Sequence, residues 1–490
     1  MIAVGLVQVL ILLFALSRAK GLAIMIGPEG VGVIGAVDQL VVTLTQISAF
    51  GIPFTAMKFM SAAHSDSDDA FKDSFTAFAR LLLILSVSVL TIGFAATRMA
   101  PGVLRLFAGY QDVVLIALLT VPPTIITILM SHTLAAAQKP KAAALYKLVF
   151  TGSITIAGLS GVWFGGLPGQ YFGVAAAGSL VIFLTMIWLG RSLGLSLWRR
   201  DVSIKRQLSI RPNAISTSMT AYFGLVTFAC TMLAVRYAVI NHMGEAATGL
   251  LQSALSLSLS VGSVLATLNG LYLAPSLNRN EPIETKFANA VRFSNRIALL
   301  MVAGAVPVAL FPGLTLSILY TDAFIPAAVA LVLCLVWQAM FQLMNVYSQL
   351  LIGIDKPMGA TLGFAVLAVV TSILAFLLVG YWGILAAPIA LMAGTLAATV
   401  SMIILLVAKA GMPLPMAVLG RFVVVTLAVG LAAFLFDGSD AFPDFSGVVL
   451  RLGYGGLAFA LILATFRNDE DINAFVTGAV SALRAPFRRR

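Results

Sequence analysis

Apolar segments of about 20 residues follow one another along almost the whole chain, and short loops between them carry most of the charge. A helix rises 1.5 Å per residue, so each segment is long enough to cross a hydrocarbon layer of about 30 Å. With 60% hydrophobic and 10% charged residues, the 490-residue chain lacks the polar surface of a soluble protein. The pattern predicts an all-α, polytopic membrane protein. It excludes a soluble enzyme, a disordered chain and a nucleic-acid binder, despite a net charge of +11.

We expect about 14 transmembrane helices from the positions of these segments. They lie near residues 2–26, 31–57, 77–97, 113–135, 142–164, 171–190, 213–241, 246–274, 293–311, 323–352, 358–379, 381–408, 415–435 and 446–466. The first segment has no basic residue before it and continues past Arg18 and Lys20, so it is interpreted as a span and not as a signal peptide.

Lysine and arginine gather in alternate loops, which places those loops in the cytoplasm. The richest are the segment 191–212 and the C-terminal tail, which ends in Arg488-Arg489-Arg490. Loops on the opposite side carry acids such as Glu245, Asp322 and Asp444. This distribution predicts that both termini are cytoplasmic, and the basic loops also suit contact with anionic membrane lipids.

An internal repeat is visible at an offset of 217 residues. Gly27 and Gly32 correspond to Gly244 and Gly249, and Lys139-Pro140 corresponds to Lys356-Pro357; a third match, at an offset of 210, joins Tyr171-Phe172-Gly173 to Tyr381-Trp382-Gly383. Since each copy holds six spans, an even number, the copies should be parallel repeats with a cleft for alternating access between them. We expect an N-lobe of residues 1–198, a C-lobe of residues 199–411, and two added spans with the basic tail in residues 412–490.

The segment 26–35 reads Ile-Gly-Pro-Glu-Gly-Val-Gly-Val-Ile-Gly, and an apolar helix then leads to Phe50-Gly51-Ile52-Pro53. This opening resembles that of the polysaccharide-type flippases of the multidrug/oligosaccharidyl-lipid/polysaccharide (MOP) exporter superfamily. The resemblance implies a transporter, not an enzyme, in a bacterial inner membrane. Its substrate would be an undecaprenyl-diphosphate-linked oligosaccharide, an O-antigen or exopolysaccharide unit, moved to the outer leaflet. Contacts with other polysaccharide-assembly proteins would follow from that role.

Four ionisable residues lie deep within the predicted spans: Arg18, Lys20, Asp38 and Arg236. Each costs about 2.5–3.5 kcal/mol at a span centre, so each should face protein or water. Arg236 maps between Arg18 and Lys20 at the repeat offset, so both lobes present cations at matching depths. Three cations and one carboxylate leave a positive surplus that a diphosphate could neutralise, since a guanidinium pairs two phosphate oxygens at once.

Other interpretations of these charges stay open. Asp38 could be a fixed counter-ion of Arg18, with the remaining cations reaching toward the interface. Asp38 could instead titrate, or bind sodium, and so couple transport to a proton or sodium gradient.

Polar side chains in the second and eighth spans recur at helical spacing; they include Gln39, Gln46, Gln252 and Ser256. They could line a hydrated cleft that accepts sugars, or form hydrogen bonds between helices. The histidines show no ligand spacing, so neither a metal site nor a cofactor is predicted. Pro122-Pro123 must kink its helix, and a static kink is expected, since Ala339-Met340 occupies the matching place in the second lobe.

Two other functions compete with a flippase. A drug/cation antiporter of the same superfamily would favour an acidic pocket, whereas the surplus here is positive. A membrane enzyme of polysaccharide assembly would need a large outer loop with catalytic carboxylates, but the longest predicted outer loop, near residues 98–112, has only about 15 residues and no paired acids.

Overall fold

The computed structural model describes residues 2–99, 109–197, 202, 212–277, 281–435 and 444–465, and the elements in these ranges are all helices. The all-α prediction is therefore confirmed for the described chain. Most of the basic segment 191–212, from residue 198 on, lies outside these ranges, as does the arginine-rich end of the tail. The chain forms two compact units, residues 1–249 and residues 250–490.

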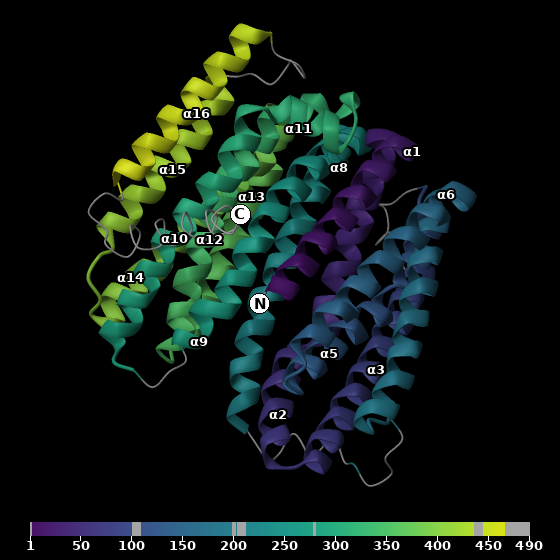
Figure 1. Ribbon diagram of the computed structural model, residues 1–490. Coiled ribbons are helices and arrows are strands. Elements are labelled where there is room, and N and C mark those ends of the chain that lie inside the picture. The colour runs from purple at the N-terminus through teal and green to yellow at the C-terminus, as the bar shows by residue number, and fades with distance from the viewer. Residues whose placement is uncertain are drawn as a thin grey trace, which may run out of the picture. The chain divides into compact units, whose positions relative to one another are not determined.

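The first unit is a bundle of long helices (Figure 1). It contains α1 (Ile2–Ala49), α2 (Ile52–Asp66), α3 (Asp68–Met99), α4 (Gln111–Leu118), α5 (Val121–Ala136), α6 (Pro140–Leu193) and the first part of α8 (Pro212–Leu268). Its core lies where α2, α3 and α5 pack together, around the buried side chains of Met60, Phe75, Leu82 and Ile125. Helix α1 packs against α6.

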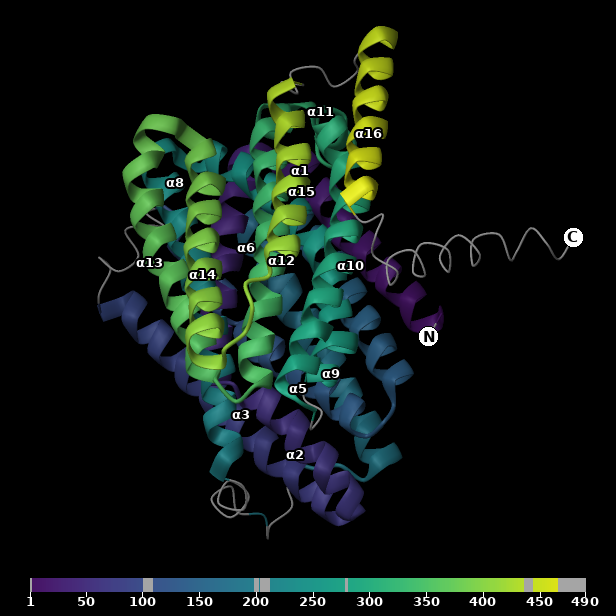
Figure 2. The same ribbon diagram turned by 90° about the vertical axis from the view of Figure 1, so that its left-hand side faces the viewer.

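The second unit is built around the buried helix α12 (Ala328–Gly353), whose Trp337 is fully enclosed and donates to Thr395 Oγ1. The remaining elements are η2 (Asn269–Leu273), α9 (Ala274–Leu277), α10 (Ile283–Leu310), α11 (Pro312–Leu319), η3 (Asp322–Ala327), α13 (Pro357–Trp382), η4 (Gly383–Leu385), α14 (Ala386–Ala410), α15 (Met416–Leu435) and α16 (Phe445–Thr465). Helices α13 and α14 lie side by side (Figure 2).

Among the described residues, nine helical segments are long and apolar enough to cross a membrane, so the chain is a multi-pass membrane protein. Four of them have 42 to 54 residues, or roughly 63–81 Å of helix, about twice the thickness of the hydrocarbon layer. Each of these four contains a glycine with positive φ, which interrupts regular helix geometry. In α6 the two halves fold back on each other. Their backbones lie so close together that the Cβ of an alanine at Gly161 would be 2.1 Å from the carbonyl oxygen of Gly169.

The repeat offset reappears in the backbone turns. Four pairs of residues with positive φ are separated by 217 positions: Gly27 (61°) and Gly244 (83°), Gln138 (55°) and Asp355 (58°), Gly166 (59°) and Gly383 (59°), and Gly194 (63°) and Gly411 (65°). Hydrogen bonds repeat as well, since Lys139 N donates to Leu134 O and Lys356 N donates to Leu351 O, both at 2.9 Å. The two copies therefore share turn geometry from residue 27 to 194 and from 244 to 411.

One of the three sequence matches used to find the repeat is wrong. Tyr171 lies five residues after the turn at Gly166, whereas Tyr381 lies two residues before the equivalent turn at Gly383. Tyr171 is buried and Tyr381 is 85% exposed. Aromatic residues and glycine are common near membrane interfaces, which explains a chance match between these segments. The offset stays at 217 throughout.

The boundary between the two units falls inside α8, between Gly249 and Leu250. The first stretch of the second copy thus belongs to the same unit as the first copy. The division into lobes of residues 1–198 and 199–411, with residues 412–490 added, stays a prediction.

Candidate functional site

Helices α1 and α8 meet at a reciprocal contact of glycines within the first unit. A Cβ on Gly32 would lie 2.0 Å from the carbonyl oxygen of Glu245, and a Cβ on Gly249 would lie 1.9 Å from the carbonyl oxygen of Pro28. Gly32 and Gly249 are equivalent residues of the two copies, and so are Pro28 and Glu245. The contact is therefore locally two-fold symmetric, and only glycine at both positions lets the backbones touch.

The same two helices are joined again further along α1. Gln39 Nε2 donates to the carbonyl oxygen of Ala229 at 3.1 Å, and Thr43 Oγ1 lies 3.2 Å from the same oxygen. Asp38 lies on α1 between the glycine contact and Gln39, and Arg236 lies on α8 between Ala229 and Glu245. Along their helices, Asp38 and Arg236 therefore both lie between these two α1–α8 contacts.

Asp38 is the centre of a three-residue network that links α1 to α6. Arg18 Nη2 donates to Asp38 Oδ2 at 3.0 Å, and Tyr171 OH donates to Asp38 Oδ1 at 2.9 Å. The side chains of Arg18 and Asp38 are 30% and 32% exposed. The ion pair that the counter-ion interpretation of Asp38 requires is therefore present, and the pair remains partly accessible.

Tyr171 is the residue of this network that sequence reasoning missed, because it served only as a repeat marker. Its ring is buried, and its hydroxyl also lies 3.2 Å from the carbonyl oxygen of Ile34. The turn at Gly165-Gly166 starts the second half of α6 and so places Tyr171 opposite α1. A carboxylate within a span needs a hydrogen-bond donor for each oxygen. This requirement is the signal in the sequence that could have pointed to a tyrosine within a span, such as Tyr171.

Arg236 is enclosed, in contrast with Arg18. Its side chain is 4% exposed, and one of its contacts is a hydrogen bond from Nη1 to the carbonyl oxygen of Met232, 3.1 Å away and one turn back on α8. Lys20 is half-buried on α1. Two residues of helix correspond to a rotation of about 200°, so Lys20 faces a different side of α1 from Arg18. The formal charges of Arg18, Lys20, Asp38 and Arg236 still sum to +2.

The polar residues expected to line a cleft have different positions. Gln39 is engaged in the bond between α1 and α8, and Gln46 is half-buried about two turns further along α1. In the second unit, Gln252 Nε2 donates to Ser256 Oγ at 2.9 Å along one face of α8. Their cleft-lining role stays a prediction.

A further contact ties the start of α4 to the turn of α8. Tyr110 OH donates to Glu245 Oε2 at 2.7 Å, and this hydrogen bond raises the pKa of Tyr110 to about 12. Within the ranges that the structure describes, no group of three His, Cys, Asp or Glu side chains is arranged to hold a metal ion.

The chain resembles known proteins in fold but not in sequence. No protein-family model matches the chain, and no curated protein matches it in sequence. Among solved structures, the lipid II flippase MurJ in an inward closed conformation matches 96% of this chain and 98% of its own, with a TM-score of 0.67 and 12% identity. A MATE multidrug resistance transporter of the MOP superfamily matches in an inward-facing conformation (TM-score 0.60, 14% identity, 85% of this chain and 95% of that one) and in an outward-facing one (0.55, 14%, 86% and 96%).

These likenesses extend over most of each chain, but the sequence identities are low, so they carry information about the fold alone. The chain is a multi-pass membrane protein with the fold of the MOP superfamily transporters.

Proposed function

We propose that this protein is a flippase for undecaprenyl-diphosphate-linked oligosaccharides, an O-antigen or exopolysaccharide unit, in a bacterial inner membrane. The four long interrupted helices count as two spans each, and with α15 they bring the total to the expected number of about 14. In this proposal two parallel six-span repeats form the transporter, α15 and α16 are additions, and both termini are cytoplasmic. The substrate crosses by alternating access of the two lobes.

The observation that carries the proposal is the cationic surplus of Arg18, Lys20, Asp38 and Arg236 within the spans of α1 and α8. A positive charge within a span is costly, and the surplus of +2 invites an anionic ligand. A diphosphate supplies that charge, and arginine binds it through two parallel hydrogen bonds. A cationic drug would meet repulsion at the same place, which is the argument against the antiporter alternative.

Asp38 has a definite part in this scheme. In the absence of substrate, its carboxylate is paired with Arg18. A diphosphate that enters the site therefore replaces this carboxylate as the anionic partner of Arg18. Arg18 therefore never loses its ionic partner, which keeps the energetic cost of substrate entry low. Protonation of Asp38, or sodium binding there, would release Arg18 and could couple transport to an ion gradient. Tyr171 holds the other carboxylate oxygen and positions Asp38 for this exchange.

The test is translocation of a lipid-linked oligosaccharide in proteoliposomes, followed by the accessibility of the glycan to an enzyme outside the vesicles. Arg236→Gln and Arg18→Gln should each lower the rate at least about tenfold, since one charge-assisted hydrogen bond contributes about 1.5–3 kcal/mol. The matched control is Arg451→Gln. Arg451 is also buried, at 6% exposure, and also donates to a backbone carbonyl, that of Leu310, but on α16 of the second unit. We expect this variant to translocate within about twofold of the wild type.

Two results would reject the proposal. The first is translocation that is unchanged in both Arg18→Gln and Arg236→Gln. The second is ion-driven export of a cationic drug by wild-type vesicles that do not move the glycolipid, which would favour the antiporter.

A further inference from the structure

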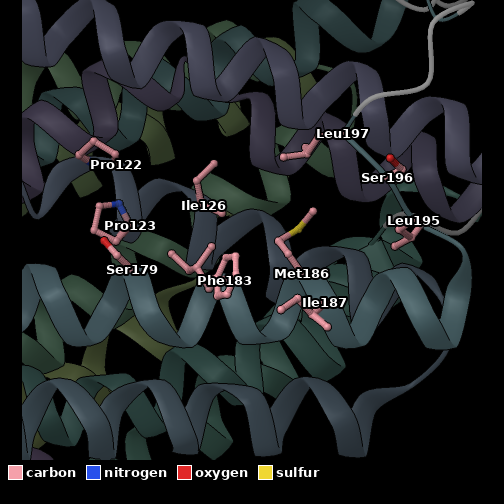
Figure 3. A pocket seen from close by; sticks show the side chains of 11 residues that line it. Pro122, Pro123, Ile126, Ser179, Phe183, Met186, Ile187, Leu195, Ser196 and Leu197 are labelled. Carbon is pink, nitrogen blue, oxygen red and sulfur yellow. The ribbon is translucent and has the colours of Figure 1, made fainter.

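A cavity of about 560 Å³ lies between α5 and α6 in the first unit, away from the charged network (Figure 3). Pro122, Pro123 and Ile126 line it from α5, and Phe183, Met186 and Ile187 line it from α6. Leu195, Ser196 and Leu197, which follow α6, close one end. The volume is within the range of small-molecule sites, and the lining is mostly apolar.

Two of the lining residues, Pro122 and Pro123, lie where a helix is interrupted. Helix α4 ends at Leu118 and α5 begins at Val121, with Pro122 and Pro123 in its first turn. Prolines cannot donate backbone hydrogen bonds, so the chain does not continue as one helix here. In the second copy, Ala339-Met340 occupies this place and α12 runs uninterrupted from Ala328 to Gly353. The interruption is therefore a feature of the first copy.

The cavity lies at membrane depth and opens at the protein surface. Its walls belong to the apolar segments Gln111–Ala136 and Pro140–Leu193, both long enough to span a membrane. Phe183 at its mouth is 62% exposed, and Ile187 is 39% exposed. The apolar side chains exposed here suit the entry of an apolar chain from the side.

Cationic side chains lie near one end of the cavity, and one of them, Lys72, is 4.0 Å from Asp69 on its own helix. Thr76 Oγ1 donates to Ser196 O at 2.7 Å, and Arg80 Nε donates to Leu197 O at 2.7 Å, so α3 fixes the segment that closes this end. Lys72 lies beside Gly194: a Cβ added at Gly194 would be 3.3 Å from the Cε of Lys72. Arg191 is exposed and follows Ile187 by one helical turn, on the same side of α6.

We propose that this cavity binds one acyl chain of an anionic membrane phospholipid, whose phosphate lies against Arg191 and Lys72. A chain carbon occupies about the volume of a water molecule, roughly 30 Å³, so the cavity holds on the order of 18 carbons. That number suits a phospholipid acyl chain. The eleven isoprene units of an undecaprenyl chain have about three times that volume, so most of such a chain would lie outside the cavity. Binding of this lipid is independent of the proposed transport function and of Arg18 and Arg236.

The experiment uses the full-length protein in nanodiscs that contain phosphatidylglycerol with a photoreactive diazirine on its acyl chain. After illumination, mass spectrometry locates the labelled peptides. We expect labelling of the segments around Ile126 and Phe183. Ser179→Trp should reduce it at least about fivefold, because Ser179 lines the cavity and a large ring there fills it.

The matched control is Leu180→Trp, at the adjacent residue, which is 57% exposed on α6 but does not line the cavity. It should retain labelling within about twofold of the wild type. Arg191→Gln and Lys72→Gln should remove the preference for phosphatidylglycerol over the zwitterionic phosphatidylcholine probe.

Three results would overturn the proposal. One is equal labelling in Ser179→Trp and Leu180→Trp. Another is equal labelling by the anionic and zwitterionic probes in the wild type. The third is preferential labelling of the cavity by a photoreactive polyprenyl phosphate, which would assign it to the tail of the substrate.

Discussion

The two copies of the repeat share the backbone geometry of their turns but differ in the side chains along their helices. Positive-φ residues recur at four places separated by 217 positions, and the Lys-Pro turns form the same hydrogen bonds. Yet Arg18 and Asp38 of the first copy correspond to Val235 and Leu255 of the second. The broken helix pair α4–α5 corresponds to the single helix α12. Turn chemistry therefore specifies the shared architecture, and the side chains between the turns make the first copy distinct.

The difference has a physical basis. A turn requires only one residue that tolerates positive φ, whereas a span requires only that its side chains be apolar or paired. Many side chains satisfy the second requirement, so one copy can carry an ion pair where the other carries leucine and valine.

The symmetric glycine contact should tolerate no side chain. Gly32→Val and Gly249→Val each place carbon atoms within about 2 Å of a backbone oxygen, so the helices must separate; overpacking of this kind costs about 3 kcal/mol or more. Thermal unfolding in detergent checks this. Gly420→Val on α15, where a Cβ meets nothing within 4 Å, is the control and should unfold near the wild-type temperature. Equal stability of all three variants would contradict the described contact.

Arg18 and Asp38 can be replaced by the residues at the equivalent positions of the second copy, valine and leucine. Asp38→Leu alone leaves Arg18 without its carboxylate and should cost about 2–3 kcal/mol. The double variant Arg18→Val with Asp38→Leu removes both charges and should recover most of that loss, while translocation remains impaired. Unfolding measurements and the vesicle assay together check this. A double variant that is less stable than Asp38→Leu would show that the pair contributes more than mutual neutralisation.

Equivalent turns should respond equally. Gly194→Ala and Gly411→Ala place a Cβ at φ values of 63° and 65°, which costs about 1–2 kcal/mol in each copy. The two losses, measured by thermal unfolding, should agree within about 0.5 kcal/mol. A loss confined to one of the two would mean that the shared dihedral angles do not reflect a shared energetic role.

The smallest effect is a gain. Gln138 and Asp355 adopt φ values of 55° and 58°, which suit glycine better. Gln138→Gly and Asp355→Gly should each stabilise the protein by about 0.5 kcal/mol, because relief of the strained φ exceeds the added entropy of the unfolded chain. Chemical unfolding curves check this, and a destabilisation in both copies would contradict it.

Sequence patterns predicted the fold to a large extent. Hydropathy located the helices because the membrane imposes one length on every span. The repeat was visible because positive φ favours glycine at residues 27 and 244, and because proline is favoured in the first turn of a helix, at residues 140 and 357. The match between Tyr171 and Tyr381 failed because aromatic residues carry no such restriction.

The charged site was only partly predictable. The depths of Arg18 and Asp38 follow from their distance along the helix, so sequence pointed to their neighbourhood. Tyr171 is 133 residues away from Asp38, and its position depends on the packing of α6 against α1. The difference in exposure between Arg18 and Arg236 likewise arises from packing, which local patterns do not encode.

In the proposed transport cycle, Arg18 and Arg236 bind the same diphosphate. This can be measured with a double-mutant cycle on the affinity of the purified protein for undecaprenyl diphosphate, using Arg18→Gln, Arg236→Gln and the pair. We expect each single variant to weaken binding at least about tenfold and the two losses to be coupled by more than about 0.5 kcal/mol. Wild-type affinity in either single variant, or losses that simply add, would contradict it.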